Sequence, residues 1–475
     1  MFESLILGAG PGGMGPLIWA AQNGTLASWL EEGVGILDRG ASMGGTLGRY
    51  VINSDSFGAA YLECLDAPAA RELFLPLRHD PATQELEPLR DALPPLVLVD
   101  RFLHRLGDRL RQIVSQYPGS RFLPHTDIRA LHLRGERALA VEASRADGSV
   151  VFVEAKTAIM ALGGRQQESA YLDAELMPGV RLVDGNAKKI MPSDALMTAA
   201  GQSRVSAVLS RARSPRVVIL GGSHSAFSVA WVLTNLLTDV AFGVGEIVIL
   251  LRRPPRIFYE TLEAAAADGY AVSERDVCPR TGRVNRLGGL RGNGRDIWRR
   301  LTRRPGTAPE DRVTTHCLSA PGLSPASLRR LLDEAALIVP AFGYRAATVP
   351  VFDATGRRLP LKADCGGPAV GRDARLLLAN GDPLPNVFAI GLGTDYRPWG
   401  RMGGEPSFDG QANSLWLYQN DIGSVVYRGV HECLRTANYP TMPAAKMSGF
   451  SLADAAREWC LDDGPAGRRG CAWNG

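Results

Sequence analysis

The sequence lacks the cysteine spacings that redox and zinc sites require. Its 7 cysteines stand far apart along the chain, and no two of them form a C-x-x-C pair. A redox dithiol of the thioredoxin-reductase kind is therefore not expected, and neither is a zinc knuckle. No cluster of His, Cys and Asp has metal-ligand spacing, so we expect no metal site. Scattered cysteines in odd number are typical of a reducing compartment, which predicts a cytoplasmic protein.

Long apolar runs and a strong charge of one sign are also absent. No stretch of about 18 uncharged apolar residues occurs, which is the length that crosses a bilayer. The chain begins directly with a predicted strand, which leaves no room for a secretion signal. The formal net charge is only +4 over 475 residues. Neither nucleic acid nor a membrane surface is therefore expected as a partner. The length allows two or three domains.

Glycine, by contrast, is abundant, and it marks a nucleotide-binding turn close to the N-terminus. The apolar segment 2–7 predicts a strand, and 14–30 predicts the following helix. Between them three glycines have the G-x-G-x-x-G offsets: Gly8, Gly10 and Gly13. A helix N-terminus offers unpaired N–H groups to a pyrophosphate, and glycine lets the backbone approach it. Asp38 ends the next predicted strand, 34–37, where an acid binds ribose hydroxyls. The pattern predicts a dinucleotide site; the alternative is a glycine-rich loop in an unrelated α/β fold.

A second glycine turn follows another apolar strand, 216–220. Its small residues are Gly221, Gly222, Ser223 and Ser225, and the two serine hydroxyls can donate hydrogen bonds to phosphate oxygens. Arg252 and Arg253 end the next predicted strand, where an NAD enzyme usually carries an acid. Because a 2′-phosphate prefers guanidinium, the pair favours NADPH over NADH. A solvated strand end is the alternative for the two arginines.

The second turn also comes close to a serine-hydrolase motif. The segment 221–225 reads G-G-S-H-S and differs by one residue from the G-x-S-x-G nucleophile elbow. Ser225 stands where the motif needs glycine, and the N-terminal glycine turn has no place in a hydrolase. We therefore interpret His224 as a loop residue near the cofactor and not as a catalytic base.

The order of the predicted elements divides the chain into two nucleotide-binding units. Residues 41–100 are expected to be loop-rich, 101–116 helical, and 121–162 a series of strands that completes the first unit. A buried strand at 335–341 is interpreted as the return to this unit, followed by a strand at 386–390 and a helix over 407–426. We therefore expect an α/β protein with two Rossmann-like dinucleotide-binding domains, the second inserted into the first. The expected parts are 1–205, 206–334, 335–440 and a C-terminal tail, 441–475.

A third segment carries a resemblance to a known family. Residues 333–344 read DEAALIVPAFGY. They resemble the D-x(3)-L/F-A-T-G-Y segment of the flavin-dependent N-hydroxylating monooxygenases, such as the lysine and ornithine hydroxylases of siderophore assembly. With the two glycine turns in the same order, the resemblance covers about residues 1–430. The chain departs from the family at Ala341-Phe342 and in the segment 44–50, which lacks the tryptophan-rich flavin loop. The amino-acid-binding residues of the siderophore enzymes find no match here.

The resemblance implies both the cofactors and the chemistry. It assigns FAD to the first turn and NADPH to the second, and it places the turn after strand 386–390 near the isoalloxazine. The glycines expected to contact the flavin there are Gly45, Gly391 and Gly393. A helix starting after Ser407 would point its N-terminus at the flavin's pyrimidine edge. NADPH would reduce FAD, dioxygen would give a C4a-hydroperoxyflavin, and a small-molecule amine would be N-hydroxylated.

The residues that bind the substrate are predicted from position only. Asn53 and Asp55 lie in a polar cluster beyond the first unit, with a surface turn as the alternative. Tyr396 and Trp399 follow the last flavin turn, with a packed loop as the alternative. The arginine-rich segment 275–304 would attract NADPH phosphates or an anionic substrate, or else form a solvated face. A C- or S-oxygenating monooxygenase and a flavoprotein without turnover are the competing functions, and a homo-oligomer is compatible with all of them.

Overall fold

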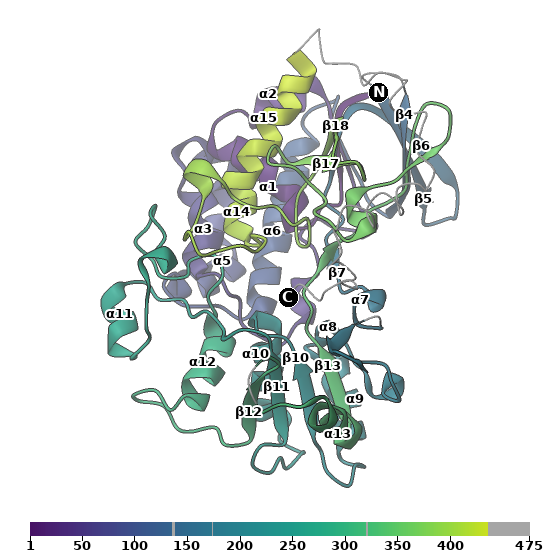
Figure 1. Cartoon of the computed structure of the whole chain (residues 1–475). Coiled ribbons are helices and arrows are strands. Elements are labelled where there is room, and N and C mark those ends of the chain that lie inside the picture. Colours follow the sequence, from purple (N-terminus) through teal and green to yellow (C-terminus); the bar gives the residue numbers. More distant parts are fainter. Residues whose placement is uncertain (135–137, 173, 320–321, 436–475) are drawn as a thin grey trace.

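The computed structural model describes residues 1–134, 138–172, 174–319 and 322–435. Figure 1 shows two α/β bodies, an upper one that contains β4, β5 and β6 and a lower one built around β10 and β11. The predicted tail, 441–475, lies outside the described residues. Within those residues, no helix has the length and apolar character needed to cross a membrane.

The upper body is built on a mixed sheet of ten strands in which β1 is flanked by β2 and β6, both parallel to it. Strand β6 is long: its first half pairs antiparallel with β5, and its second half lies between β1 and β18. The end of the predicted strand series, 150–160, is therefore one long strand. The strands of this sheet are β1 (Phe2–Leu7), β2 (Val34–Leu37), β3 (Arg121–Leu123), β4 (Thr126–Arg134), β5 (Ala138–Arg145), β6 (Val150–Met160), β15 (Val351–Phe352), β16 (Arg358–Leu359), β17 (Arg375–Leu377) and β18 (Pro383–Ala389).

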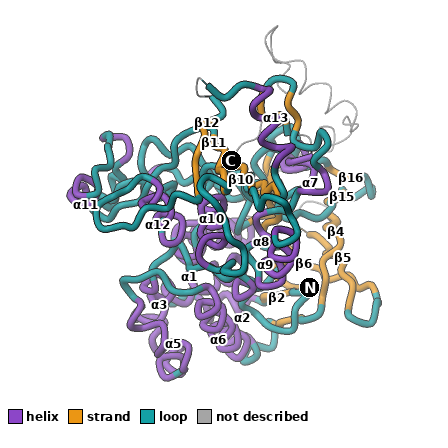
Figure 2. The backbone as a smooth tube through the Cα atoms, turned by 90° about the horizontal axis from the view of Figure 1, so that it is seen from below, coloured by secondary structure: helices purple, strands orange, loops and turns teal. Residues whose placement is uncertain are grey.

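Helices cover this sheet, and they extend through the segment that was expected to be mostly loop. They are α1 (Pro11–Gln22), α2 (Leu26–Glu32), α3 (Gly58–Asp66), α4 (Arg71–Phe74), α5 (Pro81–Leu86), α6 (Leu96–Val114), α14 (Leu415–Gln419) and α15 (Asp421–Arg435). Figure 2 shows α3, α5 and α6 gathered on one side of the body, away from β4 and β5. The single helix predicted over 14–30 is broken because Gly24 takes a φ of +71°, which a continuous helix does not allow. The helix predicted over 101–116 begins earlier, at Leu96.

The lower body is a four-stranded parallel sheet in the order β12-β11-β10-β13. Along β10, Val217 and Ile219 face one hydrophobic cluster and Val218 and Leu220 the other. Both faces are thus covered, as parallel sheets require. The elements of this body are α8 (Ser193–Leu196), α9 (Ala199–Leu209), β10 (Val217–Leu220), α10 (His224–Asn235), β11 (Ile247–Leu251), α11 (Leu262–Ala267), α12 (Gly292–Leu301), β12 (Val313–Cys317), α13 (Pro325–Glu334) and β13 (Leu337–Pro340).

Strand β13 corrects the interpretation of 335–341 as the return to the first unit. It pairs in parallel with β10, from Val217↔Leu337 to Leu220↔Pro340, inside the second sheet. The sequence of an apolar strand does not identify the strand beside it, so it could not show to which of the two sheets 335–341 belongs. The chain returns only after Ala341, where β14 (Arg345–Ala346) pairs with β7 (Gly164–Arg165). The chain therefore crosses between the bodies twice, first at β7 and again at β14, and the two crossings lie side by side. Beside the first crossing lie α7 (Glu168–Leu172), β8 (Glu175–Met177) and β9 (Val180–Arg181).

Candidate functional site

The first glycine turn is closed by backbone contacts at two of its three glycines. Gly8 has a φ of +103°, and a Cβ there would overlap the carbonyl oxygen of Ala161 on the neighbouring strand. A Cβ on Gly13 would overlap the carbonyl oxygen of Gly8. These two positions need glycine to let β1 turn directly into α1, whatever the turn binds.

Gly10 is different, because no protein atom explains it. An added Cβ would find only Gly45 Cα, at 3.7 Å, and Gly10 caps α1 with an extended backbone. Gly391 has a φ of +123° and nothing within 4 Å of an added Cβ, while an added Cβ on Gly12 would lie 3.2 Å from Gly391 Cα. The first turn, the segment around Gly45 and the turn after β18 therefore meet at one open cradle at the N-terminus of α1. A pyrophosphate fits such a cradle.

Asp38 anchors this turn as well as offering oxygens to a ribose. Its Oδ2 accepts a hydrogen bond from the backbone N–H of Ala9 at 2.6 Å, and its Oδ1 accepts one from Gly40 at 2.6 Å. Each carboxylate oxygen keeps a second lone pair for a ribose hydroxyl. Gly393, the other glycine of the last turn, packs against Arg345 on β14, so this turn also touches the second crossing.

The second turn has the same construction at the N-terminus of α10. Gly221 has a φ of +151°, and its added Cβ would lie 2.7 Å from the carbonyl oxygen of Ala341. At Gly222 an added Cβ would lie 3.2 Å from Leu251 Cβ. Ser223 is the N-cap of α10, but its hydroxyl makes no capping hydrogen bond, and Ser225 is half-buried one position into the helix. Two hydroxyls thus remain beside the free N–H groups of a helix end, an arrangement that suits a second phosphate group.

Arg252 and Arg253 lie at the end of β11, next to this turn. Arg252 is half-buried, and burial together with the charge of Arg253 lowers its pKa. Arg253 is exposed and forms an ion pair with Asp409 at 3.4 Å. The two guanidinium groups therefore repel each other, which favours the arrival of an anion between them.

Asn53 and Asp55 lie where the two bodies meet. The backbone N–H of Asn53 donates to Asn293 Oδ1 on α12 at 2.8 Å, and Arg291 Nη1 donates to the carbonyl oxygen of Asp55 at 3.0 Å. Both side chains are exposed. His224, the first residue of α10, is near the same place: its Nε2 is buried without a hydrogen-bond partner. Burial lowers the pKa of His224, the charge of Asp55 opposes this, and that of Arg291 adds to it.

Tyr396 and Trp399, the latter 46% exposed, both have a partner in the loop that precedes β17. Tyr396 is buried, and its hydroxyl donates to the carbonyl oxygen of Arg372 at 3.3 Å; Trp399 Nε1 donates to the same oxygen at 3.2 Å. Burial raises the pKa of Tyr396 to about 12. These contacts support the packed-loop alternative for both residues.

The helix expected after Ser407 is not formed there. Residues 407–414 are a loop, and α14 begins only at Leu415. Ser407 instead bonds to the lower body, through its hydroxyl to Asp276 at 2.7 Å and its backbone N–H to the carbonyl oxygen of Arg275 at 2.8 Å. Contacts with a segment far away in sequence thus hold this stretch in an irregular conformation, which local propensity does not reveal.

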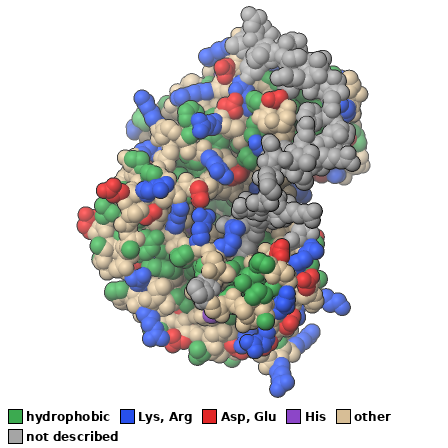
Figure 3. Space-filling view, in the orientation of Figure 1, with side chains coloured by type: hydrophobic (Ala, Val, Ile, Leu, Met, Phe, Trp, Pro, Cys, Tyr) green, Lys and Arg blue, Asp and Glu red, His purple; other side chains and the backbone are tan. Residues whose placement is uncertain are grey.

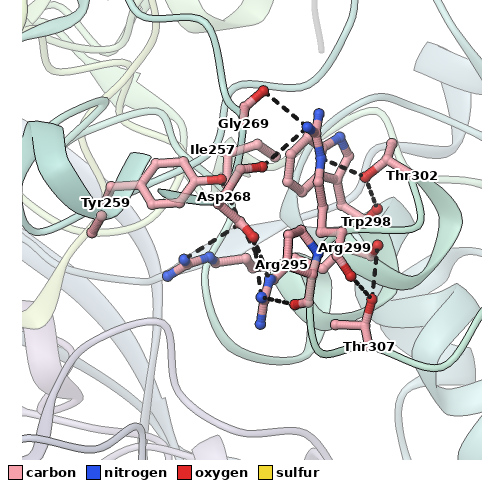
Figure 4. A network of polar contacts seen from close by, with 12 residues as sticks. Ile257, Tyr259, Asp268, Gly269, Arg295, Trp298, Arg299, Thr302 and Thr307 are labelled. Atoms are coloured by element: carbon pink, nitrogen blue, oxygen red, sulfur yellow. Dashed lines mark hydrogen bonds and ion pairs between the residues drawn. The ribbon is translucent and has the colours of Figure 1, made fainter. Parts of the chain in front are cut away.

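Much of the arginine-rich segment serves the lower body itself. Figure 4 shows Asp268 between Tyr259, Arg295 and Arg299. Tyr259 donates to Asp268 at 2.8 Å, and Arg299 forms an ion pair with it at 3.0 Å. Arg300 likewise pairs with the buried Glu310. Within the described residues, no three His, Cys, Asp or Glu side chains are grouped so as to hold a metal ion.

Two groups at the junction of the bodies, around Asn293 and Asp194, were not predicted from the sequence. Asn293 sits in a G-N-G segment, and this short polar break in an arginine-rich run is a signal that could have marked it. Asp194 accepts hydrogen bonds from Tyr50 and from Tyr344, the latter at 3.1 Å, and pairs with Arg49 at 3.1 Å. Nothing in the sequence around Asp194 indicates these partners, because they come from two distant segments, 49–50 and 344.

Comparison with known proteins decides the family. No protein-family model matches the sequence. The chain is 32% identical over 436 residues to the CMP-5′-(3-aminopropyl)phosphonate hydroxylase of Streptomyces rubellomurinus, covering 90% of this chain and 97% of the relative. The chain belongs to the flavin-dependent N-hydroxylating monooxygenases. This confirms the predicted family, enzyme class and cofactors, FAD and NADPH, and Gly10 and Gly391 leave the open backbone that a bound dinucleotide needs.

Solved structures of N-hydroxylating monooxygenases have the same fold. The cadaverine monooxygenase of Erwinia amylovora bound to FAD matches with a TM-score of 0.52 at 12% identity, over 91% of this chain and 95% of that one. The L-lysine 6-monooxygenase of Pseudomonas syringae gives 0.51 at 12% identity, over 91% and 100%. The ornithine N-hydroxylase of Kutzneria sp. 744, with reduced FAD, NADP⁺ and L-ornithine, gives 0.50 at 15% identity, over 91% and 99%. The predicted fold class, two dinucleotide-binding units in an α/β protein, is confirmed.

Proposed function

We propose that this N-hydroxylating monooxygenase acts on the primary amine of an aminoalkylphosphonate, free or linked to a nucleotide. The observation that carries the proposal is the relative from Streptomyces rubellomurinus, named for a nucleotide-linked aminopropylphosphonate and matched over 97% of its length. Identity at this level over both bodies and their junction supports a related substrate. The absence of the siderophore enzymes' amino-acid-binding residues agrees with a substrate that is not a free amino acid.

The proposed reaction is balanced by one dioxygen and one NADPH. The amine, dioxygen, NADPH and a proton give the hydroxylamine, NADP⁺ and water. When bound, FAD and NADPH supply the two electrons that activate dioxygen, so that one oxygen atom enters an N–H bond and the other leaves as water.

The protein's part in this proposal is to bind, orient and exclude water. Gly10 and Gly391 leave space for the flavin nucleotide, with Asp38 on its ribose, and Gly45 lies beside them, against Pro11. Turn 221–225 holds the NADPH pyrophosphate, with Arg252 and Arg253 on the 2′-phosphate. Loop 51–57, clamped by Arg291 and Asn293, closes the junction at which the amine would bind. Burying the reacting atoms there would suppress the wasteful release of hydrogen peroxide.

Product analysis with labelled oxygen tests the proposal. The purified enzyme, NADPH and ¹⁸O₂ are incubated with 3-aminopropylphosphonate and with its CMP-linked form, and products are analysed by mass spectrometry. We expect a hydroxylamine carrying one labelled oxygen atom, and NADPH consumption that rises with the amine. Label on carbon or sulfur of some other substrate would favour the competing C- or S-oxygenase. Slow NADPH oxidation that no amine stimulates would indicate a flavoprotein without turnover.

A further inference from the structure

The ten arginines between residues 275 and 304 fall into two groups by their partners. Five have a carboxylate within ion-pair distance: Arg280 with Asp421, Arg295 and Arg299 with Asp268, Arg300 with Glu310, and Arg303 with Asp311. The other five have no carboxylate partner in the described part of the chain: Arg275, Arg283, Arg286, Arg291 and Arg304. Arg275 is exposed, and Arg304 lies over Trp298 while donating to backbone oxygens. The remaining three are half-buried and close together.

Neutral groups hold the guanidinium groups of Arg291 and Arg286 in place. Arg291 donates to the carbonyl oxygens of Asp55, at 3.0 Å, and of Arg286, at 2.6 Å, and lies 3.9 Å from the ring centre of Phe258. Arg286 contacts Cys278 Sγ at 3.7 Å and lies 5.7 Å from the ring centre of Trp416. Arg283 makes no hydrogen bond or ion pair through its side chain with any described residue. Aromatic faces and carbonyl oxygens orient a guanidinium group without neutralising it.

The carboxylates nearby, Asp55 and Glu405, both raise the pKa of Arg291 but compensate this charge only in part, because neither forms an ion pair with the three arginines within the described residues. Glu405 is buried, and both its oxygens accept backbone N–H groups, from Leu287 at 3.0 Å and 3.1 Å and from Gly288 at 3.1 Å. Asp55 is exposed, and its contact with Arg291 is through its carbonyl oxygen. Burial lowers the pKa of Arg291 to about 10, Asp55 opposes the shift, and Arg283 and Arg286 increase it. Three like charges that face one another with so little compensation are stabilised when an anion arrives.

The position of the three arginines places that anion at the junction of the bodies. Arg291 fixes loop 51–57 of the upper body, which carries Asn53 and Asp55, and precedes Asn293 at the start of α12. Figure 3, in the orientation of Figure 1, shows basic side chains gathered in the middle of the visible face, near the level where the upper and lower bodies meet. Arg252 and Arg253, proposed for the NADPH phosphate, are on a different segment, at the end of β11.

We propose that Arg283, Arg286 and Arg291 form an arginine subsite that binds the phosphonate or phosphate dianion of the substrate. The inference rests on the proposed function and adds the residues that select an anionic amine over a neutral one. Guanidinium groups bind phosphoryl oxygens in bidentate pairs, so three of them on one short segment suit a dianion better than a carboxylate.

The test measures anion binding separately from turnover. Arg283→Gln and Arg286→Gln are compared with the wild-type holoenzyme and with Arg303→Gln. The control removes the same charge from the same segment, but at an exposed ion pair with Asp311. Calorimetry gives the Kd of methylphosphonate, and steady-state kinetics give KM for 3-aminopropylphosphonate, for neutral 1-aminobutane and for NADPH. Removing Arg283 breaks no described contact, so this variant is expected to fold; flavin absorbance and Tm verify it.

We expect about a tenfold to hundredfold rise in the methylphosphonate Kd and the aminopropylphosphonate KM for both variants, the range for lost charged hydrogen bonds. KM for 1-aminobutane and for NADPH should stay within about twofold, and Arg303→Gln should behave as wild type. Unchanged methylphosphonate binding in both variants would overturn the subsite, and so would a rise confined to the KM for NADPH. If the wild type hydroxylates no amine, the proposed function fails, while methylphosphonate binding still decides the subsite.

Discussion

At the scale of single residues, the glycines of the first turn divide into two kinds. Gly8 and Gly13 are required by the protein, because a Cβ at either position would overlap a backbone carbonyl oxygen. Gly10 is required by nothing within the described chain, since its added Cβ lies 3.7 Å from its nearest neighbour; Gly391 has open space around an added Cβ, but its φ of +123° still favours glycine. A motif that reads as one pattern in the sequence therefore combines folding and binding roles.

Substituting Gly10 and Gly13 should separate these roles. In Gly10→Ala the backbone conformation, φ −73° and ψ −173°, suits alanine, so we expect unchanged folding and a loss of bound FAD. In Gly13→Ala the overlap with Gly8 should cost about 1–3 kcal/mol of stability or more. The ratio of flavin to protein absorbance and urea unfolding check both. Full flavin retention in Gly10→Ala would remove the assignment of this turn to FAD.

Arg252 and Arg253 make the choice of nicotinamide cofactor testable. Arg252→Ala should raise KM for NADPH about tenfold or more and leave KM for NADH nearly unchanged, because only NADPH carries the 2′-phosphate. Arg253→Ala should have a smaller effect, since Arg253 is exposed and already paired with Asp409. Initial rates of NADPH and NADH oxidation give the comparison. Equal effects on the two coenzymes would refute the role of Arg252.

At the scale of elements, one carboxylate fixes α12 of the lower body. Asp268 ends α11, is 5% exposed, and binds Tyr259 on the preceding segment and Arg295 and Arg299 on α12. Burial raises the pKa of Asp268, but the hydrogen bonds from Tyr259 and Arg299 outweigh it, so that the pKa is lowered overall. The network therefore holds α12 in place, and Arg291 and Asn293 lie at the start of this helix.

This network should make part of the stability depend on acid pH. Because the folded-state pKa of Asp268 lies below its unfolded value of about 3.9, its contribution is present above that value and is lost as pH falls through the folded-state pKa. Asp268→Asn should cost about 3–5 kcal/mol at pH 7, the usual loss when one partner of a buried pair is removed. Urea unfolding of both proteins should show this difference shrinking below about pH 4. A difference independent of pH would contradict the ionised network.

At the scale of the whole molecule, the two bodies are held in a fixed relative position where the chain crosses between them. Asp194, in α8 of the lower body, accepts hydrogen bonds from Tyr50 of the upper body and Tyr344 of the second crossing. Burial raises the pKa of both Tyr50 and Tyr344, and the charge of Asp194 and its hydrogen bonds raise it further. Gln411 extends the contact, donating to the carbonyl oxygen of Tyr344 at 3.3 Å and accepting from the N–H of Asp395, next to the last flavin turn, at 3.3 Å.

Removing this contact should affect electron transfer more than cofactor binding. Asp194→Ala leaves two tyrosine hydroxyls without their acceptor, which should cost about 1–3 kcal/mol of stability. Since the relative placement of the bodies sets how the nicotinamide meets the flavin, the rate of FAD reduction in stopped flow should fall while the Kd for NADPH changes little. Asp194→Asn, which keeps an acceptor oxygen, should show a milder defect. Unchanged reduction in Asp194→Ala would mean that the contact is structural only.

The sequence by itself determined the parts of this protein that are local. A strand, a glycine turn and a helix follow from consecutive residues, because backbone freedom and free N–H groups belong to the turn itself. Both glycine turns, and from them the fold class, could therefore be predicted, whereas the choice of FAD came from the family resemblance. Even the strands on either side, 2–7, 34–37 and 217–220, were found close to their true bounds.

The tertiary structure alone decided what meets across the molecule. Strand β13 joins the second sheet, Tyr396 and Trp399 pack on Arg372, and Asn53 meets Asn293 from 240 residues away. The same holds for the ten arginines between 275 and 304, of which five pair with carboxylates and five have no carboxylate partner among the described residues. Pairing between distant residues depends on the packing of the whole chain and leaves no periodic pattern in the sequence. The partners of a charge, and so its role, become visible only in the folded molecule.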